Sequence, residues 1–180
     1  MLAAISIICG KYLAFGVGEV LRFSFENLPI IFAGIAFGPL AGGLVGAVAD
    51  LIGCILVGYS INPIVTLGAV TVGVTSGGAY RLLKRLGIKK RPLRVGLSVG
   101  CAHLIGSVLI KTFGLAMFYT MPVYILMLWR LLNYFIVGML EAFILMPLME
   151  NKMLEHQLGS MKITRTPKER QENESNDELR

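Results

Sequence analysis

The sequence predicts an all-α membrane protein with six transmembrane helices. Its mean hydropathy is +0.70, and only 16% of its 180 residues are charged, against about 25% in a typical soluble domain. Thirteen of the 17 Lys and Arg residues lie in two segments, residues 81–94 and the tail after Glu150. Cytoplasmic connections of membrane proteins concentrate Lys and Arg, so we expect both segments on the inner face of the membrane.

Two parts of the chain differ in composition. Residues 1–150 are mostly apolar and leave room for five to seven spans of roughly 20 residues, so we expect one membrane domain there. Residues 151–180 are polar and mixed in charge, which predicts a disordered cytoplasmic tail. The net charge of +6 does not indicate nucleic acid, because the basic residues lie where the phosphates of inner-leaflet lipid would be.

Prolines mark the starts of most expected helices, since the first helical turn tolerates a missing N–H. Asn27 and Asn62 shortly precede two of these prolines and are favourable N-cap residues. Pro147 is expected to close the last helix. The expected helices are residues 1–16, 28–38, 39–57, 63–84, 92–115 and 122–148. With the basic loop inside, six spans place both termini in the cytoplasm.

The connection between the first two helices departs from a simple spanning bundle. Residues 28–38 give about 16 Å of helix, against about 30 Å of hydrocarbon. Such short segments, interrupted by Gly or Pro, are typical of the substrate site of a transporter. Residues 22–25 alternate as a strand would. We expect a structured extracellular helix 1–2 loop over a pocket, with an ordinary solvated hairpin as the alternative.

Small residues recur at every fourth position on several helices, where they allow helix backbones to approach closely. They are Gly42 and Gly46, Gly73 and Gly77, Gly96 and Gly100, and, on the first helix, Ser6, Gly10, Ala14 and Gly18. Internal packing of the bundle explains most of them. For the first helix, docking onto another membrane protein is an alternative.

Ionisable residues within the apolar segments cost about 2.5–3.5 kcal/mol each at the centre of a span, so they should face one another or a cavity. Arg22, Lys111 and Arg130 belong to the outer half of the expected topology, as do Asn62 and Thr66. Converging cations suit an anionic solute. The tyrosines of this half suit a planar one or form an interfacial belt; they are Tyr59, Tyr119 and Tyr124. Lys111 could alternatively extend to the interface.

Motifs for catalysis are absent from the sequence. Without a G-x-x-x-x-G-K-[ST] loop, the chain is not expected to use ATP itself. No set of metal ligands accompanies Asp50, so we expect no metal. His103 and Ser107 share a helix face, but no oxyanion motif accompanies them, which favours a structural role. We expect no catalytic residue and no bound cofactor. A small intramembrane enzyme and a purely structural subunit are the alternatives.

A family resemblance rests on residues 22–50, which contain R-x-S-F-x-x-L-P-I, then F-G-P, then G-x-x-x-D. Further on stand INPIVTLGA, IKTFGL and WRLLNY. With these motifs residues 1–148 resemble the S components of energy-coupling factor (ECF) vitamin transporters of prokaryotes, and most of all the folate-specific members. S components for other vitamins, such as pantothenate, a pyrimidine precursor or thiamin, are the alternative.

The resemblance implies that the chain captures a vitamin at an outward-facing pocket without catalysis. It implies a location in the prokaryotic plasma membrane and docking onto a transmembrane T subunit with two ATPase subunits, which use the ATP. The docking motif A-x-x-x-A of the family aligns with Ala4 as its second alanine, so its first would precede Met1. Docking is therefore expected to use Ala4 or the ridge of Ser6, Gly10 and Ala14.

Carried onto this sequence, the resemblance also implies a set of residues that contact folate. Three cations would pair with carboxylates or polar ring groups, two polar residues of the fourth helix would hydrogen-bond the ring, and a tyrosine would stack on it. These substrate-binding residues are Arg22, Lys111 and Arg130, then Asn62 and Thr66, then Tyr119 or Tyr124.

Overall fold

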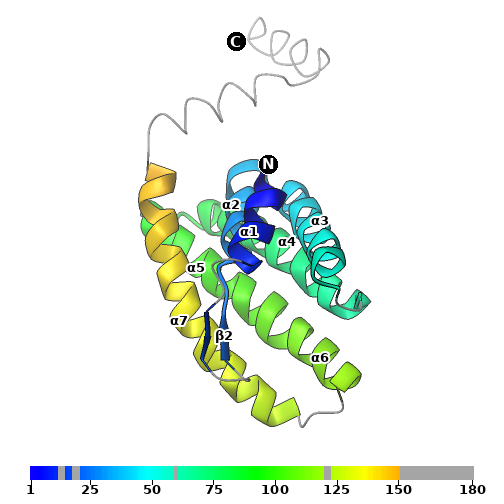
Figure 1. The fold of residues 1–180 in the computed structure, drawn as a ribbon. Helices are drawn as coiled ribbons and strands as arrows, with labels where there is room; N and C mark the ends of the chain where they lie inside the picture. Colours follow the sequence, from blue (N-terminus) through cyan, green and yellow to red (C-terminus); the bar gives the residue numbers. More distant parts are fainter. Residues whose placement is uncertain (12–14, 18–20, 59–60, 120–122, 151–180) are drawn as a thin grey trace, which may run out of the picture.

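The structure is a computed structural model that describes residues 1–11, 15–17, 21–58, 61–119 and 123–150. Helices lie in each of the six predicted ranges, and one short antiparallel hairpin accompanies them (Figure 1). The elements are α1 (Leu2–Lys11), β1 (Phe15–Val17), β2 (Leu21–Phe23), α2 (Asn27–Phe37), α3 (Pro39–Val57), α4 (Pro63–Arg85), α5 (Arg91–Ala102), the π-helix η1 (His103–Ile110), α6 (Lys111–Tyr119) and α7 (Val123–Glu150). The predicted tail, residues 151–180, lies outside the described residues.

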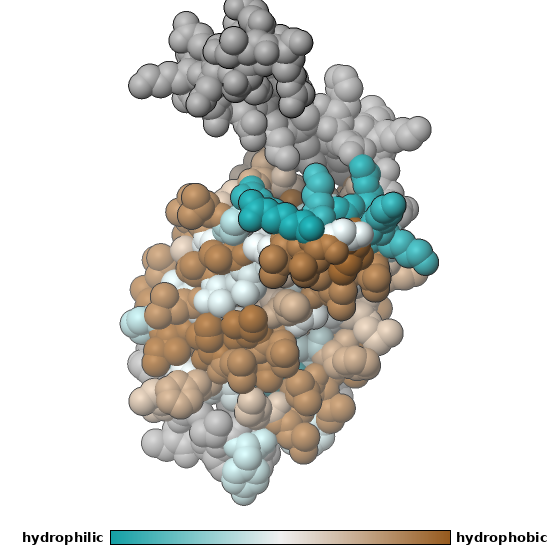
Figure 2. Space-filling view, turned by 180° about the vertical axis from the view of Figure 1, so that it is seen from behind, coloured by the Kyte–Doolittle hydropathy of each residue, from teal (hydrophilic) through white to brown (hydrophobic). Residues whose placement is uncertain are grey.

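Three stretches of the described chain are long and apolar enough to cross a membrane. They are Pro39–Val57, Arg91–Gly114 and Met127–Met149. Large apolar side chains are exposed along them, among them Leu44, Leu104 and Phe143. In the face shown in Figure 2, hydrophilic side chains gather at one end and apolar surface covers most of the rest. This distribution suits a molecule surrounded by hydrocarbon, and the predicted helical membrane class is confirmed.

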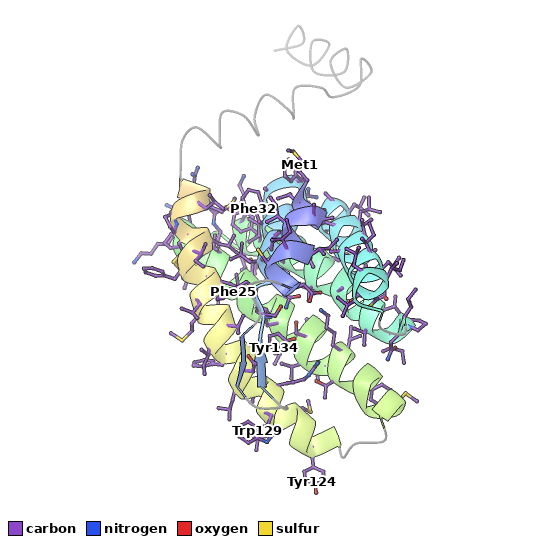
Figure 3. The ribbon with its side chains drawn as sticks, viewed as in Figure 1. Met1, Phe25, Phe32, Tyr124, Trp129 and Tyr134 are labelled. Atoms are coloured by element: carbon purple, nitrogen blue, oxygen red, sulfur yellow. The ribbon has the colours of Figure 1, made fainter. Side chains whose placement is uncertain are left out.

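Different segments of the chain lie at the two ends of the described bundle. The start of α1 and the C-terminal end of α7 lie at the same end of the molecule, while the end of α6 and the start of α7 lie at the other (Figure 1). Figure 3 accordingly places Met1 and Tyr124 at opposite ends. The stretch from Arg81 to Arg91 covers the end of α4, its link to α5 and the first residue of α5. We call it the basic α4–α5 connection, and its Lys and Arg residues are exposed.

The centre of the fold is a close crossing of α2, α3 and α4. Ile30 and Ile31 of the short helix α2 are completely buried, so its few turns lie within protein. A Cβ atom on Gly73 would overlap the backbone of Gly42, and one on Gly34 would overlap the carbonyl of Gly73. Only glycine permits this approach. The predicted packing role of the small residues on α3 and α4 is confirmed.

Several predicted boundaries are wrong. The fifth helical segment continues to Tyr119 instead of ending at residue 115. The first helix ends at Lys11 instead of residue 16, because Phe15 pairs with Phe23 in the hairpin. Pro147 lies inside α7, which continues to Glu150; near a helix end a proline removes one backbone hydrogen bond without ending the helix. Asn27 belongs to α2 itself, whose N-cap residue is Glu26.

Candidate functional site

A polar cavity lies between the segment that joins β2 to α2 and the helices α2, α3, α4, α6 and α7. Its volume is about 180 Å³. We call it the polar chamber; it is lined by Ser24, Glu26, Asn27, Asp50, Val65, Lys111, Arg130, Asn133, Tyr134 and Val137. Two cations and two carboxylates share this lining. Ionisable groups at membrane depth are costly, and where they gather around a cavity they generally mark a functional site.

The structure brings two of the predicted cations, Lys111 and Arg130, to this one chamber. Lys111 is only 6% exposed, and its Nζ donates a long hydrogen bond of 3.5 Å to Oδ1 of Asn27. A guanidinium nitrogen of Arg130 donates to the backbone carbonyl of Ser107 at 3.3 Å. The third predicted cation, Arg22, lies in β2 opposite Gly16, and the placement of its side chain is outside the described set.

Hydrogen bonds from α4 and α1 hold the two acidic residues of the chamber, Asp50 and Glu26. Thr66, at the N-terminal end of α4, donates from its hydroxyl to Oδ2 of Asp50 at 2.7 Å. Ser6 of α1 donates from its hydroxyl to the backbone carbonyl of Glu26 at 2.6 Å, which holds the connection between the hairpin and α2. Thr66 therefore reaches the chamber through Asp50.

Other predicted contact residues lie away from the chamber. Asn62 is the N-cap of α4, where its Oδ1 accepts from the N–H groups of Ile64 and Val65, and its Nδ2 donates to the carbonyl of Gly114 at 3.1 Å. Its amide is thus occupied within the protein. Tyr124 is 75% exposed at one end of the molecule (Figure 3). The side chain of Tyr119 is outside the described set.

The π-helical segment η1 joins α5 to α6, and α6 begins with Lys111 of the chamber. Through η1 the backbone N–H of Lys111 donates to the carbonyl of Gly106 instead of that of Ser107, its α-helical acceptor. The Ser107 carbonyl accepts from Arg130 of α7. Short π segments inside α-helices frequently occur at functional sites. Lys111, one cation of the chamber, thus directly follows this segment. Ser107, within the segment, supplies an acceptor to Arg130, the other cation.

Behind the chamber lies a buried network of ionisable and aromatic groups. Nε2 of His103 is 2.6 Å from Oε2 of Glu141, and Nδ1 is 3.4 Å from the hydroxyl of Ser107. The imidazole stacks on the ring of Tyr134, with ring centroids 5.1 Å apart. The guanidinium carbon of Arg130 lies 6.0 Å from the centroid of that same ring.

A larger hollow, of about 560 Å³, is an apolar groove between α5, η1 and α7. We call it the apolar groove. It is lined mainly by glycines and large apolar residues, with His103 and Tyr134 at its wall. Tyr134 therefore separates the groove from the polar chamber. Because its lining carries no Lys or Arg, the groove suits an anionic ligand less well than the chamber does.

The residues predicted for docking on α1 lie on different sides of the helix. Ala4 is exposed, whereas Ser6 and Gly10 are buried. A Cβ atom on Gly10 would lie 3.1 Å from the Cβ of Glu26, so this face of α1 packs on the connection that lines the chamber. Ala14 lies outside the described residues. Docking through α1 remains a prediction.

Several lining residues were not in the predicted set. Glu26, Asn27 and Asp50 line the chamber together with Lys111 and Arg130. Glu26 and Asp50 interrupt apolar stretches in the sequence, which was a usable signal. Asn27 was interpreted as an N-cap residue instead of a lining residue, because an Asn near a helix start also fits an N-cap. Among the described residues, no group of three or more His, Cys, Asp or Glu side chains could hold a metal ion.

The fold and the chamber define a helical membrane protein with a polar cavity among its helices. The family described as ECF transporter, substrate-specific component, matches residues 1–149. The chain belongs to this family, and the assignment made from its motifs is confirmed.

Individual relatives include a folate transporter, FolT, of Clostridium novyi (strain NT). It is 33% identical over 79 residues, which are 43% of this chain and 45% of that protein; the matched region thus spans less than half of the relative. A solved structure of FolT bound with folic acid is 25% identical, with a TM-score of 0.62, over 79% of this chain and 84% of the other. A solved S component of a bacterial ECF transporter shares the fold at 18% identity and a TM-score of 0.56, over 92% and 94%.

Proposed function

We propose that this chain binds folate, or a reduced folate, as the substrate-specific subunit of an ECF importer in the plasma membrane of a prokaryote. The observation that carries the proposal is the meeting of Lys111 and Arg130 in one buried chamber. The two carboxylates of a folate tail suit more than one cation, because charge-assisted hydrogen bonds are stronger than neutral ones. The likeness to FolT supports the choice of this vitamin.

The mixed charge of the chamber also fits a ligand with two kinds of polar group. Glu26 and Asp50 are acceptors, and the glutamate end of folate presents an amide N–H donor beside its two carboxylates. The chamber is smaller than the roughly 300–1,000 Å³ of a typical ligand pocket. It therefore receives one end of the vitamin. In this proposal Arg22, Tyr119 and Tyr124, on the hairpin and at the α6–α7 end, contact the remainder.

The same carboxylates favour a second candidate. With two acids and two cations in the lining, the chamber is close to neutral, so a less anionic vitamin is the alternative. Pantothenate, a pyrimidine precursor and thiamin are the compounds to compare. A thermal-shift panel on the detergent-purified protein separates them: folic acid should give the largest increase in melting temperature, because ligand binding stabilises the folded state.

The test of the site is calorimetry with folic acid on Arg130→Ala. Loss of a charge-assisted pair costs about 1.5–3 kcal/mol, so we expect affinity to fall at least about tenfold, while the protein stays monodisperse. Arg85→Ala is the matched control, since Arg85 is exposed on the basic α4–α5 connection. Equal affinity of the Arg130 variant and the unmodified chain would place the pocket elsewhere.

We further propose that a T subunit and two ATPase subunits supply the energy, since the sequence contains no phosphate-binding loop. All six helical segments would cross the membrane, with both termini and the basic connection in the cytoplasm and the hairpin outside. The shared end of α1 and α7 in Figure 1 fits this orientation. Affinity purification from cells that co-express the other subunits tests the assembly; recovery of this chain alone would oppose it.

A further inference from the structure

Glu141 and His103 form a buried pair that the binding of an anion by the chamber does not itself require. Glu141 is fully buried and His103 is 3% exposed, and neither lines the polar chamber. Burying two ionisable side chains together is expensive, and their attraction often does not repay the cost. Oε1 of Glu141 also has no hydrogen-bond partner among the described residues. A pair this costly at membrane depth calls for a role.

The contacts of His103 lead directly to the chamber. Its ring stacks on Tyr134, and Tyr134 is a wall of the chamber beneath Arg130. Its other nitrogen is 3.4 Å from the hydroxyl of Ser107, the residue whose carbonyl accepts from Arg130. The aromatic support of the Arg130 guanidinium therefore stacks on the imidazole, and the residue that supplies its backbone acceptor contacts the imidazole through a different atom, the hydroxyl of Ser107.

We propose that Glu141 and His103 are positioning residues: through Tyr134 and Ser107 they fix the guanidinium of Arg130 in the orientation that receives an anionic ligand. Ligand-contacting groups need neighbours that lock their geometry, and the 2.6 Å contact with Glu141 fixes the plane of the imidazole. The other cation of the chamber, Lys111, is held from Asn27 instead. The inference rests on the proposed function, because its readout is folate affinity.

The experiment is a double-mutant cycle on folic acid affinity, measured by calorimetry on the full chain. Glu141→Gln keeps the shape and replaces the carboxyl group with an amide. We expect it to lower affinity about fivefold to tenfold in the unmodified chain and less than about twofold in an Arg130→Lys background, where the planar guanidinium is already gone. In a Lys111→Met background the full loss should persist. Ser98→Ala, another buried polar change on α5, is the control and should leave affinity unchanged.

Ser107→Ala provides a second, milder variant should Glu141→Gln fail to fold. It removes the hydroxyl beside His103 and keeps the carbonyl used by Arg130, and we expect a twofold to fivefold loss that also vanishes with Arg130→Lys. Equal losses in all backgrounds, or no loss, in a chain that binds folic acid would overturn this inference alone. Absence of saturable binding by the unmodified chain would overturn the proposed function and this inference with it.

Discussion

Two regions of the bundle bury their residues in opposite ways. One is the crossing of α2, α3 and α4, and the other is the polar chamber beside α6 and α7. In the first region Gly34, Gly42 and Gly73 bring backbones into contact and leave no space for side chains. In the second, Lys111, Arg130 and their neighbours are kept around a hollow. Small residues at helix interfaces stabilise a bundle by close packing, whereas buried charges cost energy.

This difference predicts that stability and ligand binding depend on different residues. Substitutions at the glycine crossing should change the free energy of unfolding, and substitutions around the chamber should change ligand affinity. The glycines Gly96 and Gly100 sharpen the contrast, because they have the same spacing as the crossing glycines but lie on the apolar groove. A Cβ on Gly100 would meet nothing within 4 Å.

The largest effect is expected for Gly73→Ala. Its methyl group would overlap the backbone of Gly42, and forced overpacking costs about 1–3 kcal/mol or more, so we expect a lower melting temperature and a lower yield of monodisperse protein. Gly100→Ala is the matched control, for which the helix preference of Ala should raise the free energy of unfolding by up to about 1 kcal/mol. Equal destabilisation by both changes would show that the crossing is not special.

Lys111→Met should produce the next largest effect, this time on affinity. Met retains most of the buried stem but removes the ammonium, and the carboxylates of Glu26 and Asp50 are then opposed by one fewer cation. We expect folic acid affinity to fall about tenfold, roughly 1.4 kcal/mol. Lys84→Met, on the exposed basic connection, controls for loss of charge. An unchanged affinity for the Lys111 variant would argue that the ligand lies away from α6.

Asn62→Ala is expected to give the smallest effect and to act on stability. Loss of an N-cap typically costs about 1 kcal/mol, and the hydrogen bond to the Gly114 carbonyl is lost as well. Thermal unfolding should shift down by a few degrees while folic acid affinity changes less than threefold. Asn62→Ser retains a cap acceptor and should recover part of the loss. A large fall in affinity with little change in stability would instead make Asn62 a ligand contact.

Much of the fold followed from local sequence. Pro39 and Pro63 marked the starts of α3 and α4 at the residues where the helices begin, because the chemistry of a helix start depends on a few neighbouring positions. The end of the first helix did not follow, since Phe15 joins a strand only through its partner Phe23. The cations Lys111 and Arg130 were recognisable because charge within an apolar stretch is rare.

The sequence by itself determined the membrane class, the helical segments and the two cations, since hydrophobicity, proline position and isolated charge are properties of short stretches. Only the tertiary structure decided that Asp50 and Glu26 share the chamber, that Asn62 is occupied as a cap, and that His103 meets Glu141. Those facts depend on how helices far apart in the chain rotate against one another. That rotation is set by the close packing of complete side-chain surfaces, which no local pattern contains.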